Sequence, residues 1–362
     1  MAYDKADEKK GRCAKNRTKL FTKGVFILTA ANIVIKLAGL LFKVPMNYIV
    51  GDTGMGYYGS AYSIYTFLYM LSTAGLPVAV SIMVAEGRSA GRFMQVRKVF
   101  RTALLIFCAV GCVGSGAMLI FAGRLAALIG SEPSVFCIAA IAPTLLFICI
   151  SSAFRGYFQG CEAMIPIAVS QLIEALGKLI LGIGAALYSI RMGYGIHVTA
   201  AYAVSGVSVG SLIGMLYLMA AKLFFRDPRE GEGLHVSAET TSSAALLKRF
   251  AAISLPITVS SSVMSLSGMI DTVLIQRMLR LSGMGQEAAT TLYGNYTSLA
   301  LPMFNLPPVL IYPITCALIP LLTSARAVVD MKQTGRLVTS SLRAAVLIGM
   351  PCAIGLASLS YP

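Results

Sequence analysis

The chain has 362 residues, of which 57% are hydrophobic and only 12% are charged. Soluble domains carry about 25% charged residues, so this composition excludes an ordinary soluble domain and predicts a membrane protein. The formal net charge of +15 does not indicate a nucleic-acid partner, because the Lys and Arg residues cluster between apolar runs, where membrane topology and anionic lipid headgroups account for them.

Nine apolar runs are long enough to cross a hydrocarbon core of about 30 Å. Each is expected to be a helix, because a helix satisfies its own backbone polar groups inside lipid. The runs lie at 24–44, 57–84, 102–122, 134–154, 163–188, 199–224, 250–274, 291–323 and 340–360. The sequence therefore predicts an all-α, polytopic membrane protein with about nine transmembrane helices.

The distribution of basic residues predicts the orientation. Residues 1–23 form a tail with eight Lys or Arg, and the apolar run that follows is too long for a signal-peptide core, so it is expected to be an uncleaved first span. The tail and the connections predicted on its side of the membrane hold 23 Lys or Arg. The connections on the opposite side hold four. Because cytoplasmic loops carry the positive excess, we expect a cytoplasmic N-terminus.

A polar linker at 225–249 divides the chain. It separates six spans, in a lobe at 24–224, from three spans in a lobe at 250–362. A second lobe that matched the first would need three more spans. We therefore expect a partial C-terminal lobe and a shortened chain.

Several spans contain residues that break or bend helices. Gly75-Leu76-Pro77 is predicted to interrupt the second span, Pro143 the fourth and Pro256 the seventh, and the eighth holds five prolines. Two interpretations stay open: hinges near a substrate path, as in transporters, or ordinary membrane-helix kinks.

The sixth span carries glycine at every fourth position, at Gly206, Gly210 and Gly214. Small residues at this spacing let a neighbouring helix approach closely, so we predict a helix-packing face here.

Lys36 lies in the middle of the first span. Asn32, Lys36, Gly39 and Lys43 share one face of a helix, because they are spaced by three or four residues. An ammonium at mid-bilayer costs at least about 2.5 kcal/mol, so this face should meet a wet cavity or a partner. A cavity that binds phosphate or carboxylate is the favoured interpretation, and a structural ion pair is the alternative. Lys43 could equally snorkel to the headgroups.

Five further charged residues inside or near spans are candidates for the same cavity. Glu174 and Lys178 stand four residues apart in the fifth span, where they either neutralise each other or line the cavity, with Glu174 tuning Lys178 or binding a cation. Arg155, at the inner end of the fourth span, is expected to snorkel or to contact a headgroup. Asp271 and Arg277, near the outer end of the seventh span, either bind an anionic group or lie at the interface.

No enzyme is indicated. The chain lacks paired carboxylates, a nucleophile with a base, and a phosphate-cradling loop in a strand–turn–helix context. The eight cysteines are scattered without ligand spacing, so neither a disulfide framework, a metal site nor a cofactor is expected.

An ordered set of short motifs resembles the stage V sporulation protein B-like polysaccharide transporters. The motifs are Ile35-Lys36-Leu37-Ala38-Gly39, Lys43-Val44-Pro45, Gly51-Asp52-Thr53-Gly54-Met55-Gly56-Tyr57-Tyr58, Ala61-Tyr62-Ser63-Ile64-Tyr65, Ser72-Thr73-Ala74-Gly75-Leu76-Pro77, Val84-Ala85-Glu86, Arg155-Gly156-Tyr157-Phe158-Gln159-Gly160, Tyr293-Gly294, Ala300-Leu301-Pro302 and Asn305-Leu306-Pro307. That family is similar to the lipid II flippases and belongs to the multidrug/oligosaccharidyl-lipid/polysaccharide exporter superfamily.

The resemblance implies two lobes around a central cavity, alternating access, and an undecaprenyl-pyrophosphate-linked saccharide moved across the bacterial cytoplasmic membrane. It implies that Lys36 and Lys43 match cationic cavity residues of the flippases, with Lys43 in place of the commoner Arg. A lipid-linked oligosaccharide and membrane lipids are the expected partners, and a coupling cation stays open. The alternatives are a cation-coupled drug exporter of the same superfamily, a non-transporting membrane scaffold, and a membrane glycosyltransferase, which would need acidic loops that the chain lacks.

Overall fold

The computed structural model describes residues 2–225, 243–305, 307, 311 and 331–359, and in these ranges the regular structure is helical. In chain order the helices are α1 (Ala2–Thr73), α2 (Leu76–Ser89), α3 (Phe93–Ile120), α4 (Ala122–Ile129), the 3₁₀ turn η1 (Glu132–Ser134), α5 (Val135–Gly160), α6 (Met164–Arg191), α7 (Ile196–Phe224), α8 (Ser243–Leu281), α9 (Gln286–Asn295), the π-helical η2 (Tyr296–Ala300), α10 (Leu301–Phe304) and α12 (Met331–Leu359). The all-α fold class is confirmed.

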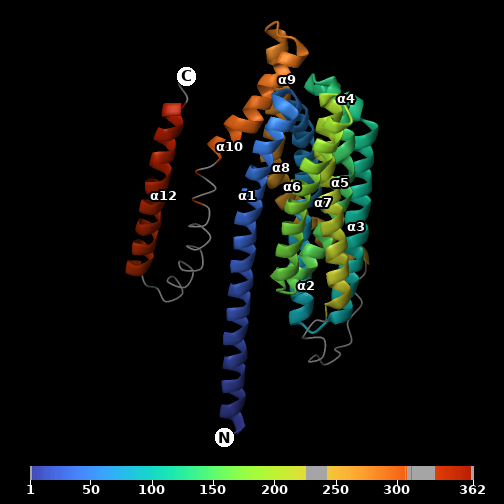
Figure 1. Cartoon of the computed structure of the whole chain (residues 1–362). Coiled ribbons are helices and arrows are strands. Elements are labelled where there is room, and N and C mark those ends of the chain that lie inside the picture. The colour runs from blue at the N-terminus through green and yellow to red at the C-terminus, as the bar shows by residue number, and fades with distance from the viewer. Residues whose placement is uncertain (1, 226–242, 306, 308–310, 312–330, 360–362) are drawn as a thin grey trace. The chain divides into compact units, whose positions relative to one another are not determined.

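The chain forms two compact units, Met1–Gly294 and Asn295–Pro362. In the first unit α7 lies against α5 and α6, α3 against α5, and α1 against α6 (Figure 1). The first unit also includes α8 and α9, which follow the predicted linker. Most of that linker, 226–242, lies outside the described residues, and the predicted lobe boundaries stay predictions.

Helix α1 reverses direction at Gly51. This residue has φ 68° and ψ 177°, which is outside the helical region and in the positive-φ range that favours glycine. The rings of Phe42 and Tyr58 lie 5.7 Å apart, although 16 residues of continuous helix would separate them by about 24 Å. The two arms of α1 are therefore neighbours, and they correspond to the predicted first span and the start of the second.

The helix boundaries confirm one predicted interruption and overturn two. The chain breaks between Thr73 and Leu76, as Gly75-Leu76-Pro77 predicted. The predicted interruptions at Pro143 and Pro256 are wrong, because α5 and α8 run through them. Other groups re-satisfy the backbone around a proline inside a membrane helix, so such a helix can continue.

Two other elements differ from the sequence prediction. Residues 2–23, expected as a tail, have helical backbone that continues into the first span. Helix α4 was missed, because its eight residues are too few for a span. In the proline-rich eighth span, residues 306, 308–310 and 312–323 lie outside the described residues.

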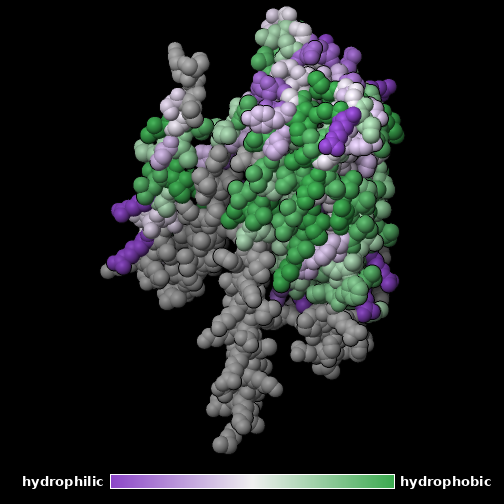
Figure 2. All heavy atoms as spheres, viewed as in Figure 1, coloured by the Kyte–Doolittle hydropathy of each residue, from purple (hydrophilic) through white to green (hydrophobic). Residues whose placement is uncertain are grey.

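Seven helices in the described ranges are long and apolar enough to cross a membrane. The first covers Ala30–Ser89, and the reversal at Gly51 divides it into two crossings. On the face of the first unit shown in Figure 2, hydrophobic residues form a broad band over the middle of the helices, and hydrophilic residues gather toward both ends. The polytopic architecture is confirmed.

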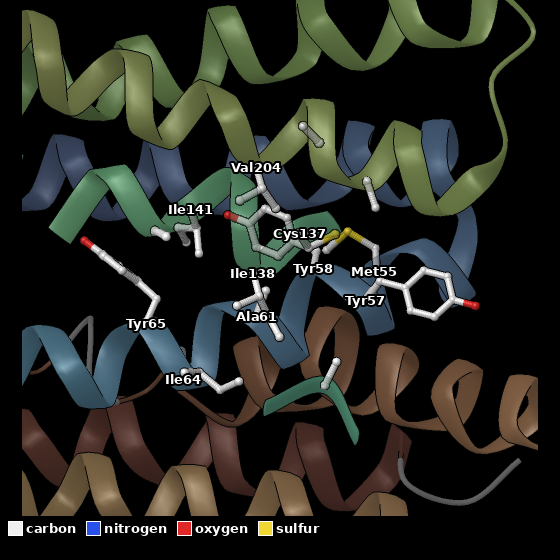
Figure 3. Packing of buried hydrophobic residues seen from close by; sticks show 14 of the residues in the cluster. Met55, Tyr57, Tyr58, Ala61, Ile64, Tyr65, Cys137, Ile138, Ile141 and Val204 are labelled. Carbon is white, nitrogen blue, oxygen red and sulfur yellow. The ribbon is translucent and has the colours of Figure 1, made fainter. Parts of the chain in front are cut away.

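The core of the first unit joins the second arm of α1 to α5 and α7. Figure 3 shows Tyr58, Ala61 and Tyr65 of α1 beside Ile138 and Ile141 of α5. These residues are at most 5% exposed, so the second arm of α1 is fixed inside the bundle. That arm carries the aromatic residues of the site described next.

Candidate functional site

The glycines of α7 bring α6 unusually close, as the four-residue spacing predicted. A Cβ added to Gly206 would lie 2.3 Å from the backbone nitrogen of Gly182, and one added to Gly177 would lie 2.6 Å from Cα of Gly210. A Cβ on Gly210 would lie 3.0 Å from the backbone nitrogen of Lys178. This contact fixes the segment of α6 that carries the charged residues.

Lys178 lies in an aromatic cage formed by the two arms of α1. Its Nζ is 4.9 Å from the ring centroid of Phe42, 5.6 Å from that of Tyr58 and 4.8 Å from that of Tyr62. Aromatic faces attract a cation electrostatically but carry no net charge. The cage therefore holds the ammonium in place without neutralising it.

A tyrosine ladder runs along the second arm of α1 from this cage. The centroids of Tyr58, Tyr62, Tyr65 and Tyr69 follow one another at 5.7, 5.6 and 6.0 Å. Tyr58 and Tyr62 lie beside Lys178, and Tyr65 and Tyr69 lie near Arg155 and Glu174. The ladder thus links two charged centres in the interior of the first unit.

The second charged centre is an ion pair between α5 and α6. Nη2 of Arg155 binds Oε1 of Glu174, and these side chains are only 12% and 17% exposed. Sequence reasoning expected Arg155 to snorkel, and it considered mutual neutralisation of Glu174 and Lys178. In the structure Arg155 points into the bundle and pairs with Glu174, because α5 places the guanidinium against the face of α6 where Glu174 lies.

The other residues of the predicted cationic face lie on the first arm of α1. Lys43 is half-buried and close enough to Lys178 for their charges to repel each other. Lys36 is exposed and Asn32 is half-buried. The structure therefore brings Lys43 to the centre around Lys178, and the role of the whole face stays a prediction.

Arg277 and Arg280 bind the end of the unpredicted helix α4. Nε of Arg277 donates to the carbonyl of Leu128 at 2.9 Å, and Nη1 of Arg280 donates to that of Gly130 at 3.0 Å. Carbonyls at a helix C-terminus lack helical partners and carry partial negative charge, so they attract cations. The structure brings Arg277 to α4 and leaves Asp271 exposed.

A polar seam joins α8 and α9 to the second arm of α1. Nε2 of Gln276 donates to Ser60 at 2.7 Å, and Thr272 donates to Ser63 at 2.9 Å. The hydroxyls of Thr53 and Thr291 are 2.8 Å apart. Sequence reasoning missed these contacts, because single hydroxyl residues scattered in apolar spans give no signal of their partners.

The start of α8 is also tied to the preceding helices. Nη2 of Arg249 binds both carboxylate oxygens of Glu86 at 2.7 and 2.9 Å, and both side chains are about half exposed. Helix α8 therefore touches the preceding helices near both of its ends. Within the described ranges, no group of three or more His, Cys, Asp or Glu is placed to hold a metal ion.

The sequence is similar to curated proteins of Bacillus subtilis (strain 168). It is 29% identical over 301 residues to stage V sporulation protein B, a match that covers 83% of this chain and 57% of that protein. It is 23% identical over 355 residues to the lipid II flippase MurJ, a match that covers 94% of this chain and 64% of that protein. The chain thus spans about three fifths of the length of these curated relatives.

Solved structures show the same fold. The chain is similar to the inward-facing conformation of a multidrug resistance MATE family transporter of the MOP superfamily, with a TM-score of 0.63 at 16% identity over 88% of this chain and 72% of that one. It is also similar to the MATE multidrug transporter DinF-BH, with a TM-score of 0.59 at 14% identity. This match covers 94% of this chain and 72% of that one. The fold is therefore MATE-like. The model of the polysaccharide biosynthesis protein family matches residues 21–326, and the chain belongs to that family.

Proposed function

We propose that the protein is a flippase that moves an undecaprenyl-pyrophosphate-linked saccharide across the bacterial cytoplasmic membrane, and that it is not an enzyme. One observation carries the proposal: Lys178, about 20 Å from either end of α6, contacts aromatic rings while the nearby carboxylate of Glu174 is bound to Arg155. The names of the relatives support it, since one is called a lipid II flippase.

The chemistry of the site suits a pyrophosphate headgroup. A phosphate anion cannot enter hydrocarbon without groups that replace its water, and ionic hydrogen bonds are the strongest replacement. Lys178 supplies an ammonium, which binds phosphate as a point charge with three donors. We assign Lys178 and Lys43 to the headgroup, and Lys36 and Asn32 to the same path further along α1.

The remaining candidates have supporting roles in this proposal. Glu174 and Arg155 form the ion pair beside Lys178. Asp271 and Arg277 lie toward the opposite end of α8 from Arg249. Arg277 anchors α8 to α4 rather than binding the headgroup, and Asp271 is assigned no headgroup contact.

Alternating access requires contacts that separate and re-form. In the proposed topology, with a cytoplasmic N-terminus, the Ser60–Gln276 contact lies toward the outer side and the Glu86–Arg249 pair toward the inner side. Water can replace hydrogen bonds and half-exposed ion pairs more easily than it can replace apolar packing. We propose that lobes at 24–224 and 250–362 rock about the site and break these contacts in turn. A coupling cation or the membrane potential, worth about 2.3 kcal/mol per charge per 100 mV, would drive the cycle.

The main alternative is export of an organic cation, because the two solved structures compared above are named as multidrug transporters. The ammonium of Lys178, with Lys43 nearby, would repel such a substrate. A scaffold without transport activity is the other alternative.

Complementation tests the proposal. The full-length gene is expressed in a strain depleted of its own lipid II flippase, with variants Lys36→Ala and, as the charge-preserving control, Lys36→Arg. We expect rescue of growth by the wild type and by Lys36→Arg but not by Lys36→Ala. Equal rescue by Lys36→Ala would remove Lys36 from the path, and failure of the wild type would contradict a lipid II-type substrate.

A further inference from the structure

Glu174 has two potential basic partners, Lys178 and Arg155, and forms an ion pair with Arg155. On α6 it precedes Lys178 by four residues, the spacing and order that favour an ion pair along a helix. Instead its carboxylate binds Arg155, which comes from α5. The choice between these partners decides the charge that Lys178 presents.

The surroundings of Glu174 hold it on the Arg155 side of α6. A Cβ added to Gly214 of α7 would lie 2.7 Å from Cγ of Glu174, so α7 presses directly on this side chain. Lys178 instead meets Phe42, Tyr58 and Tyr62, which all belong to α1. The two side chains of the potential helical pair are therefore held by different helices.

The energetic consequence follows from the low exposure of the charged side chains, which is 12% for Arg155 and 17% for Glu174. A carboxylate that moved next to Lys178 would cancel most of its field, because opposite charges interact strongly where solvent screening is weak. Such an internal pair would have to break before an external anion could bind. Aromatic contacts impose no such cost, since the rings carry no net charge.

We propose that Arg155 is a positioning residue that binds Glu174 and so keeps this carboxylate from neutralising Lys178. The pair of Arg155 and Glu174 is neutral overall, and the ammonium of Lys178 stays able to bind a phosphate oxygen. This inference rests on the proposed function, because it requires an anionic headgroup at Lys178.

Binding of undecaprenyl pyrophosphate to the complete protein in lipid nanodiscs tests the inference. Arg155→Gln frees Glu174 to pair with Lys178, so binding should weaken about tenfold. Glu174→Gln leaves the guanidinium of Arg155 without its carboxylate, which adds net positive charge near Lys178, so this variant should bind more tightly than the wild type. The double variant Arg155→Gln/Glu174→Gln should return to within about threefold of the wild type.

A purely structural ion pair would behave differently. Loss of either partner would then weaken binding alike, so weaker binding by Glu174→Gln overturns the inference even if Arg155→Gln fails to fold. In a Lys178→Gln background, Arg155→Gln should cause no additional loss, because the charge that it protects is gone.

The same measurements separate this inference from the proposed function. If Lys178→Gln binds the lipid as well as the wild type does, the proposed headgroup site is wrong. If Lys178→Gln weakens binding but Arg155→Gln does not, only the positioning role is wrong.

Discussion

Two lysines of the first unit lie in aromatic cages, and their positions along the helices differ. Lys178 of α6 has Phe42, Tyr58 and Tyr62 within 5.6 Å of Nζ. Lys222 of α7 lies 3.6 Å from the ring centroid of Tyr157, with two further rings within 5.9 Å. The local chemistry is the same, because in each case three rings surround one ammonium.

The consequence of each cage depends on its depth in the span. Lys222 is in the last turn of α7, where a lysine reaches the headgroups and interacts favourably with the helix C-terminus. Lys178 is near the middle of α6, where a charge is costly and is retained for a partner or a function. An aromatic cage therefore does not by itself indicate a binding site. The position of the lysine along the membrane-spanning helix determines whether its charge needs a partner or a function.

The largest expected effect separates the two lysines directly. Lys178→Gln should reduce transport of the lipid-linked saccharide about 100-fold, because an ionic hydrogen bond of about 3 kcal/mol to the headgroup is lost. Lys222→Gln, the matched control, should stay within about twofold of the wild type, since Lys222 lies in the last turn of α7, away from the proposed headgroup site. Transport into the outer leaflet of proteoliposomes measures both. Equal losses would contradict the depth argument.

A smaller effect is expected when α6 is moved away from α7. A Cβ on Gly210 would lie 2.9 Å from the carbonyl oxygen of Glu174 and 3.0 Å from the backbone nitrogen of Lys178. Gly210→Ala should therefore displace the Lys178 cage, lower the melting temperature by overpacking, and reduce transport about tenfold. The cage at Lys222, about three turns further along α7, should remain intact.

Gly184→Ala is the control for this change. Gly184 is also a helical glycine of α6, but nothing lies within 4 Å of an added Cβ. Alanine there should raise stability by about 0.5–1 kcal/mol through helix propensity and leave transport unchanged. Thermal unfolding in detergent compares the two variants, and equal melting temperatures would exclude the close contact.

The smallest effect is expected from a single ring of the cage. Tyr62→Leu removes the nearest ring from Lys178 and should lower headgroup affinity about threefold, which corresponds to a cation–π contribution of about 0.7 kcal/mol. Tyr62→Phe keeps the ring face and should bind like the wild type. Binding of undecaprenyl pyrophosphate in nanodiscs measures both, and a large loss in Tyr62→Phe would point to the hydroxyl instead of the ring.

The sequence was sufficient for the features that depend on short-range pattern. Apolar run length predicted the spans, Gly75-Leu76-Pro77 predicted the break before α2, and the spacing of Gly206, Gly210 and Gly214 predicted the close packing of α6 and α7. Each of these follows from backbone hydrogen bonding or helix periodicity, which residues a few positions apart determine.

The partners of the charged residues depended on tertiary structure. Glu174 had a suitable lysine four residues away, yet it binds Arg155, 19 positions earlier in the chain. Likewise, the rings around Lys178 come from both arms of α1, which meet because the chain reverses at Gly51. Helix periodicity states which face a charge occupies, but only the packing of a second and third helix decides what that face meets.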